Sequence, residues 1–370
     1  MKKSLLVCLF LQVPATAWAT APASPKPSAF RPARGMSAAE RYARRCQSQS
    51  AHHTSPPQET MRRWGSGSSD STSGSRRMQG RMLWGTKGHW NTEVVPERDS
   101  VLASASLAPL LQAVDGVKAL RLEGGHLVAS PTPVGAAASG IVGTVLRGTS
   151  SDGTPVEVAI CGAEPSFTDS EMVFYRIQAW NPLDQEWKNP CLADSNVPDP
   201  RALAVSGVWD SRGAHQEAPG KFTFACERGA ITKCILWGYK PWARGDWRPM
   251  ADLHQACTRM ARADYCGNGE SHTQQDTVID FYDRFSIVER TERDLSSSSF
   301  EAAWAPDGAA CLARTRDGRA VETLLQECPE RLQTGAAVEL GEGERCTVRR
   351  ADVRPEDALL RNLTFAPLNR

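Results

Sequence analysis

The chain has 370 residues, eleven cysteines, and 43 Lys or Arg against 42 Asp or Glu, which gives a formal net charge of +1. This near-neutral balance gives no indication of nucleic-acid binding by the chain as a whole. No Cys-x-x-Cys pair occurs, and its absence excludes zinc ribbons and zinc knuckles.

The first residues are typical of an export signal. Met1-Lys2-Lys3 precedes an apolar run from Leu5 to Val13, and Ala17-Trp18-Ala19 follows it. The run is shorter than the roughly 20 residues that cross a bilayer. We therefore expect a signal peptide over residues 1–19, cut after Ala19, and a periplasmic or extracellular protein with no transmembrane segment after signal removal.

Residues 20–76 have the composition of a disordered leader or linker. From Thr20 to Ser100 there are 13 Lys or Arg against 6 Asp or Glu, and Ser66–Ser75 is almost entirely Ser, Gly, Thr and Asp. We interpret the basic stretch as a solvated, flexible segment. A short helix is expected at Ser37–Arg45, after which Cys46 has the opportunity to pair with the folded part, residues 77–370.

Removing Cys8 with the signal leaves ten cysteines. An even number in an exported chain indicates disulfides, because oxidising compartments let them form and persist. Five bridges are expected, although the sequence leaves their connectivity open.

Alternating apolar residues and turn signals predict several hairpins. One runs from Gly143 to Ile160 with an Asp-Gly turn, and another joins Ala302 to Leu312 through Asp307-Gly308. A third hairpin is expected over Lys221–Tyr239. Its strands would place Cys226 opposite Cys234, at the Cβ spacing that a disulfide requires.

Helical spacing of apolar residues predicts three helices. The first covers Ser106–Asp115, the second carries an apolar face from Met250 to Met260, and the third runs from Val321 to Cys328. Strands outnumber helices, so the expected fold class is α+β, β-rich, with short antiparallel strands and disulfide staples.

The segment after the second helix carries a resemblance to a known family. It reads Ala263-Asp264-Tyr265-Cys266-Gly267-Asn268-Gly269, with Trp237-Gly238-Tyr239-Lys240-Pro241-Trp242 upstream and Cys311 and Cys328-Pro329 downstream. Together these residues resemble the ADYC domain of exported bacterial proteins, over roughly residues 140–330. The resemblance implies export and a shared cysteine framework, and it implies no reaction.

The same segment partly matches a calcium-binding loop. Counted from Asp264, oxygen ligands stand at positions 1 and 5 and a glycine at position 6, with Glu270 at position 7. Position 3 is Cys266 and position 12 is Gln275, so two ligands are missing. Asp264, Asn268 and Glu270 are the candidate ligands, and calcium is the only cofactor that the sequence suggests. A structural role for Asp264 and Cys266 is the alternative.

Acid–base chemistry is a second hypothesis for this segment. His272 lies near Asp264, Asp276 and Asp280 in the sequence, which is the residue set of a secreted hydrolase. No Gly-x-Ser-x-Gly elbow accompanies them. The alternative is a surface histidine with no catalytic role.

Trp237, Tyr239, Trp242 and Trp247 form an aromatic cluster in a segment that also contains Pro241. Exposed aromatic rings beside charged residues bind sugars, flat ligands or partner proteins, whereas buried ones pack a core. We expect a non-catalytic exported protein with a binding or structural role. An envelope component, a glycan or another protein is the expected partner.

Overall fold

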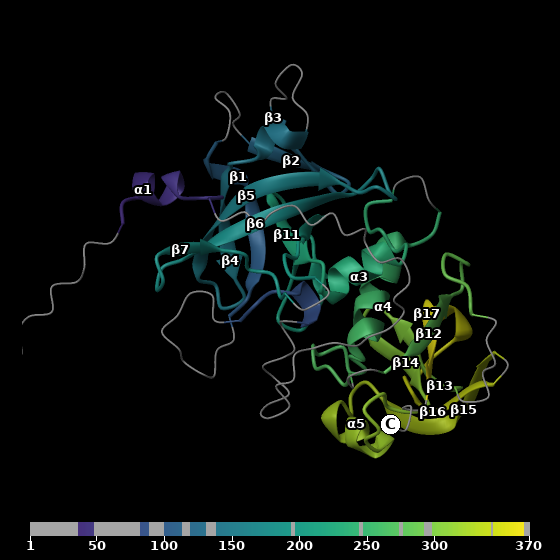
Figure 1. Cartoon of the computed structure of the whole chain (residues 1–370). Helices are drawn as coiled ribbons and strands as arrows, with labels where there is room; N and C mark the ends of the chain where they lie inside the picture. Colours follow the sequence, from purple (N-terminus) through teal and green to yellow (C-terminus); the bar gives the residue numbers. More distant parts are fainter. Residues whose placement is uncertain are drawn as a thin grey trace, which may run out of the picture. The chain divides into compact units, whose positions relative to one another are not determined.

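The computed structural model describes residues 36–47, 82–88, 100–112, 119–130, 138–193, 197–243, 247–273, 277–291, 298–341 and 343–365 (Figure 1). The predicted signal peptide and most of the predicted leader lie outside these residues. The elements from Ala38 onward belong to one structural unit, Ala38–Arg370. No helix within the described ranges is long and apolar enough to cross a membrane.

Strands dominate the structure, and the fold class is confirmed as α+β, β-rich. In the first half the elements are α1 (Ala38–Ala43), β1 (Leu102–Leu111), β2 (Ala119–Glu123), β3 (His126–Ser130), β4 (Val145–Ser150), β5 (Pro155–Pro165), β6 (Val173–Asn181), β7 (Glu186–Lys188), β8 (Ala202–Ser206), β9 (Val208–Trp209), β10 (His215–Gln216) and β11 (Lys221–Cys226). In the second half they are α3 (Ala230–Leu236), α4 (Met250–Arg262), β12 (Ile279–Asp283), β13 (Ser298–Ala305), β14 (Gly308–Leu312), α5 (Val321–Glu327), β15 (Gln333–Gly341), β16 (Glu344–Arg349) and β17 (Leu360–Phe365).

The first sheet closes into a barrel. Its strands run in the order β5-β4-β1-β11-β8-β6-β7, and an additional pairing between β5 and β6 joins the two sides of the sheet. Alternate side chains of β11 point inward, so Phe222 and Phe224 belong to the barrel core together with Tyr175. Side chains fill the interior because a barrel of this few strands has no room for a channel.

The second sheet is open and antiparallel, in the order β12-β17-β13-β14-β16-β15. The hairpin predicted through Asp307-Gly308 is confirmed as β13 and β14, and the Gly143–Ile160 hairpin is confirmed as β4 and β5.

Helices α3 and α4 pack together between the two sheets (Figure 1). One core cluster contains residues of the barrel's outer face, of both helices and of the second sheet, such as Leu203, Leu253 and Trp304. The predicted helices at Met250–Met260 and Val321–Cys328 are confirmed as α4 and α5.

Two predicted elements are wrong. Ser106–Asp115 was expected to be helical, but Ser106–Leu111 belongs to strand β1, which pairs with β4 and β11. The second half of the Lys221–Tyr239 hairpin is helix α3, because Ile231, Cys234 and Ile235 recur at helical spacing and are buried together.

Five disulfides join the ten cysteines of the described residues. They pair Cys46–Cys161, Cys191–Cys226, Cys234–Cys257, Cys266–Cys328 and Cys311–Cys346. Cys46, for which the sequence leaves pairing open, is paired with Cys161. The predicted Cys226–Cys234 bridge is wrong, because Cys234 turns with α3 toward Cys257 on α4, while Cys226 points into the barrel core and meets Cys191.

The first prediction concerns this connectivity. A chain starting at residue 20, denatured without reductant, is expected to show no free thiol in a colorimetric titration. Mapping of unreduced peptides should join Cys191 to Cys226 and Cys234 to Cys257. Two or more free thiols, or a peptide linking Cys226 to Cys234, would contradict the pairing.

His254 on α4 is fully buried against α3, where its Nε2 lies 3.0 Å from the carbonyl oxygen of Ile231. Burial lowers the pKa of His254 to about 4. Between pH 4 and the unfolded-state pKa of about 6.5, the unfolded chain binds a proton that the folded chain does not. The free energy of unfolding is therefore not reduced by His254 above about pH 6.5, and it falls as the pH drops toward 4.

The second prediction follows from this difference. The free energy of unfolding should fall by up to about 3 kcal/mol between pH 6.5 and 4 through His254 alone. In His254→Gln this part of the pH dependence should disappear, as measured by urea denaturation across the range. His126→Gln, at a half-exposed position of the β2–β3 hairpin, is the control. An equal pH dependence in wild type and His254→Gln would rule out the buried neutral histidine as its source.

Candidate functional site

The Ala263–Cys266 tetrapeptide forms the turn that ends α4. Ala263 takes a left-handed conformation, with φ of 50°, and closes the helix. Asp264 is fully buried, and its carboxylate accepts hydrogen bonds from Arg259 Nη1 at 2.5 Å and from the Gly269 amide at 3.1 Å. The acidic group of the motif is therefore held in an internal ion pair.

Tyr265 continues the turn into the second sheet. Its ring stacks on Trp304, with centroids 5.2 Å apart. Its hydroxyl donates to Glu301 at 3.1 Å and accepts from the Arg316 amide at 2.7 Å. Burial raises the pKa of Tyr265 well above its ordinary value of 10, with the charge of Glu301 adding to the effect. Tyr265 is thus a neutral hydrogen-bonding group.

Glu301 and Arg316 form an ion pair that is fully buried, with Nη2 and Oε1 2.8 Å apart. Arg316 also donates to the carbonyl oxygens of Met260 and Ala261, in the last turn of α4. The Met260 carbonyl also accepts from the Ala263 amide at 3.0 Å, so the guanidinium adds a second donor there. Its charge opposes the helix dipole.

Gly267 brings the turn against the β13–β14 hairpin. Its φ is +66°, and a Cβ there would lie 1.8 Å from the carbonyl oxygen of Asp307. On the other side, the Tyr265 carbonyl accepts from the Ala309 amide at 2.9 Å. Only glycine tolerates this approach.

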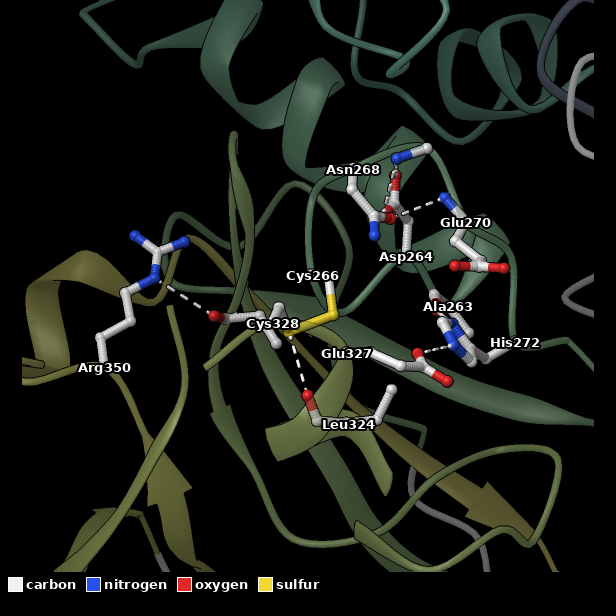
Figure 2. Close-up of a disulfide and its surroundings, with 12 residues drawn as sticks. Ala263, Asp264, Cys266, Asn268, Glu270, His272, Leu324, Glu327, Cys328 and Arg350 are labelled. Carbon is white, nitrogen blue, oxygen red and sulfur yellow. Dashed lines mark hydrogen bonds and ion pairs between the residues drawn. A yellow bond between two sulfur atoms is a disulfide. The ribbon is translucent and has the colours of Figure 1, made fainter. Parts of the chain in front are cut away.

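The Cys266–Cys328 disulfide fastens the turn to the end of α5 (Figure 2). A cavity of about 820 Å³ opens beside it. Its lining is mostly charged: Cys266, Asn268, Asp307, Glu327, Cys328, Pro329, Glu330, Arg331, Arg350, Ala351, Asp352 and Asp357. Arg331 and Arg350 both pair with Asp307.

His272 is 1% exposed and lies beside Glu327, which lines this cavity (Figure 2). Its Nδ1 lies 3.0 Å from the carbonyl oxygen of Ala263, and its Nε2 lies 3.0 Å from Glu327 Oε2. Both ring nitrogens therefore face oxygen acceptors, which positions the ring as a cross-link between the turn and α5.

The hydrolase candidates are not brought together by these contacts. Asp264 is paired with Arg259, and Asp280 accepts from the hydroxyl of Thr291 at 2.7 Å. Asp276 lies outside the described residues. The carboxylate beside His272 is Glu327, which the sequence prediction did not include.

The calcium candidates are also spread over different contacts. The Asp264 carboxylate is occupied as described, whereas the side chain of Asn268 accepts from the Glu270 amide at 2.9 Å (Figure 2). Within the ranges that the structure describes, no group of three His, Cys, Asp or Glu has the geometry to hold a metal ion.

The aromatic segment divides into packed and exposed rings. Tyr239 is fully buried and donates to Asp283 at 3.0 Å, and half-buried Trp237 packs on Phe281 with centroids 4.7 Å apart. Half-buried Trp242 lies against the turn between β2 and β3. Trp247, in contrast, is 81% exposed. Of the four aromatic residues predicted to form a ligand surface, Trp247 is the one with a largely exposed ring.

A second aromatic ring accompanies Trp247. Phe285 lies 5.4 Å away in an edge-to-face arrangement, and the Arg284 guanidinium lies 5.3 Å from the Phe285 ring. Asp283 fixes the loop that carries them, since its carboxylate accepts from the amides of Phe285, Ile287 and Val288. We call Trp247, Phe285 and Arg284 the aromatic surface.

Sequence reasoning missed Glu301, Arg316, Asp283 and Phe285. Glu301 meets Arg316 and Tyr265, which are 15 and 36 residues away, whereas Asp283 accepts from amides two to five residues ahead of it. The one available signal was the sequence Asp-Arg-Phe-Ser, because Asp is a frequent turn former.

Comparison with known families supports the resemblance that the Ala263–Cys266 tetrapeptide indicates. Residues 138–318 match the family model described as the ADYC domain. The searches of curated proteins and of solved structures give no match. The matched range contains the Ala263–Cys266 turn and the aromatic surface, while α5 lies just beyond it.

The third prediction tests the turn as a structural element. Tyr265→Phe removes one hydroxyl that serves both Glu301 and the Arg316 amide, and should lower the free energy of unfolding by about 1–3 kcal/mol. Tyr42→Phe is the matched control, because Glu157 there keeps its two hydrogen bonds from Arg41. Equal losses in the two variants, measured by urea denaturation, would show that the Tyr265 hydroxyl has no special role.

Proposed function

We propose that this ADYC-domain chain is exported and acts without catalysis, as a binding protein whose contact surface is the aromatic surface. Its origin in a bacterium and its place in the envelope or outside the cell are part of the proposal. Pairing of all ten cysteines after Cys8 supports export, because such bridges persist in oxidising compartments.

The contacts of the ADYC turn support a structural role for the motif. The side chains of Asp264, Tyr265 and Cys266 are engaged in an ion pair, a hydrogen-bond network and a disulfide. Groups committed in this way are not available to attack a substrate. The side chains of the motif therefore serve to join α4 to the second sheet.

Trp247 is the observation that carries the proposal. An indole that is 81% exposed gives up the stabilisation that burial of a large side chain provides. The Asp283 loop holds a second ring beside it in a fixed position, which lowers the entropy that binding must overcome. Rigid aromatic anchors of this kind dominate binding energy at interfaces.

A glycan is the partner that suits this surface best. Indole and phenyl faces offer flat apolar platforms, and Arg284 adds hydrogen-bond donors at their edge. A sugar ring presents both an apolar face and hydroxyl groups, so it uses both features. A glycan of the cell envelope is therefore the proposed ligand.

The secreted-hydrolase hypothesis stays a prediction with a simple test. His272→Ala should destabilise the chain, because it removes the contacts to Ala263 and Glu327, and it should leave glycan binding by the folded fraction unchanged. Loss of a hydrolytic activity in this variant, on a substrate panel that wild type cleaves, would favour the hydrolase instead.

The fourth prediction tests the binding surface. Wild type should co-sediment with insoluble peptidoglycan or give signals on an immobilised oligosaccharide array, and Trp247→Ala should weaken this binding by about 30-fold, as expected for loss of an aromatic anchor. Phe285→Ala should have a smaller effect in the same direction.

Phe167→Ala is the matched control, because Phe167 is also exposed, at 88%, and lies in the loop between β5 and β6. Equal weakening by Phe167→Ala would place the contact elsewhere. Absence of binding by wild type to all of these probes would contradict a glycan ligand.

A further inference from the structure

The five disulfides differ in how far solvent reaches their sulfur atoms. In three of them both cysteines are at most 2% exposed: Cys191–Cys226, Cys234–Cys257 and Cys311–Cys346. In the fourth, Cys266 is 4% exposed, Cys328 is half-buried, and both line the cavity of about 820 Å³. An attacking thiolate needs such access.

The fifth bridge, Cys46–Cys161, is also accessible at half-buried Cys46, and Cys161 lines a smaller cavity of about 420 Å³. It ties α1 to strand β5. Opening it would free an N-terminal arm and leave the sheets and their cores in place. The Cys266–Cys328 bridge, in contrast, connects two elements of the folded body.

Helix α5 depends strongly on the Cys266–Cys328 bridge. It has seven residues, of which Leu324 alone is buried, and an isolated helix of this length is not stable in water. Besides Leu324 and Cys328, its attachment consists of half-buried Val321 and Leu325, which pack at the edge of the core, and of Glu327, which pairs with His272 at 3.0 Å and with Arg319 at 3.1 Å.

We propose that Cys266–Cys328 is a thiol–disulfide exchange site whose substrate is a dithiol, and that its reduction releases α5 and uncovers His272. This proposal is independent of the aromatic surface. It makes the ADYC cysteine a reducible group, while the other side chains of the turn keep their structural contacts.

The reaction proceeds in two steps. A thiolate of the dithiol attacks Cys328 Sγ, the more exposed sulfur, and forms a mixed disulfide; the Cys266–Cys328 bond breaks and its electron pair leaves on Cys266 Sγ, which takes up a proton. The second thiol, deprotonated, then attacks the sulfur of the reductant in the mixed disulfide and expels Cys328 as a thiolate, which is protonated in turn. Two electrons and two protons pass to the chain, and the reductant leaves as a disulfide.

The consequence is mechanical. Once Cys328 is free, the covalent link between α5 and the turn is gone, and release is opposed by the packing of Val321, Leu324 and Leu325 and by the Glu327 ion pairs. The Glu301–Arg316 pair and the contacts of Tyr265 do not involve α5. The turn therefore keeps its position while the wall of the cavity that contains Glu327 moves away from His272.

The fifth prediction is an order of reduction. A chain with Cys46→Ser and Cys161→Ser is treated with dithiothreitol at neutral pH without denaturant, alkylated, and mapped by mass spectrometry. Cys266 and Cys328 should be labelled at least about 100-fold faster than the six cysteines of the buried bridges, because the latter react only after the structure opens. Simultaneous opening of all four bridges, or a different first bridge, would overturn the proposal.

Hydrogen exchange tests the consequence. After this selective reduction, amides of Val321–Leu332 should exchange at least about 10-fold faster, while those of α4 stay protected. The variant with Cys266→Ala and Cys328→Ala should reproduce this local change. Replacement of Cys311 and Cys346 by Ala is the control and should leave α5 protected. Unchanged exchange in α5 of the selectively reduced chain would overturn the proposed release, whether or not the double variants fold.

Discussion

The buried ion pair between Glu301 and Arg316 is the interaction on which the centre of the molecule depends. Helix α4 ends inside the structure, so its last carbonyl groups have no water to bond with. Arg316 donates to the carbonyls of Met260 and Ala261, the first of which the Ala263 amide also reaches, and Glu301 balances its charge. Removing either partner would leave the other charge buried and unpaired, which costs far more than the pair itself contributes.

The same pair decides which parts of the site are fixed and which can move. Glu301 accepts from the hydroxyls of Tyr265 and Thr364 as well as from Arg316, so the ADYC turn, β13 and β17 converge on one carboxylate. The hydrogen bonds and ion pairs of Glu301 and Arg316 described above do not involve α5. The Cys266–Cys328 bridge therefore attaches α5 to a turn that the hydrogen bonds of Glu301 already hold in place. For this reason the bridge can open without unfolding the turn or the two strands.

The sequence predicts elements well where apolar residues repeat at the spacing of the element, and poorly where strand pairing determines the structure. Helix α4 was predicted because its apolar residues keep helical spacing, even though polar residues of the helix are buried as well. Strand β1 was not: Leu107 and Leu110 repeat at helical spacing, yet pairing with β4 and β11 outweighs this local preference. At the aromatic surface, Trp247 was among the residues predicted from the sequence. Phe285 and Asp283 were not, because the fold alone brings their loop next to Trp247.

The structural unit extends beyond the residues that define the family. Strand β1, before the matched range 138–318, lies between β4 and β11 in the barrel, and β17, after it, lies between β12 and β13. Three disulfides also join a cysteine inside the matched range to one outside it: Cys46–Cys161, Cys266–Cys328 and Cys311–Cys346. A fragment limited to the matched residues would lack a central strand of each sheet, and the unpaired strands beside each gap would lose their ladder hydrogen bonds. The segment that matches the family model consequently needs flanking segments on both sides to complete its cores, and the one after it contains Cys328, which holds α5.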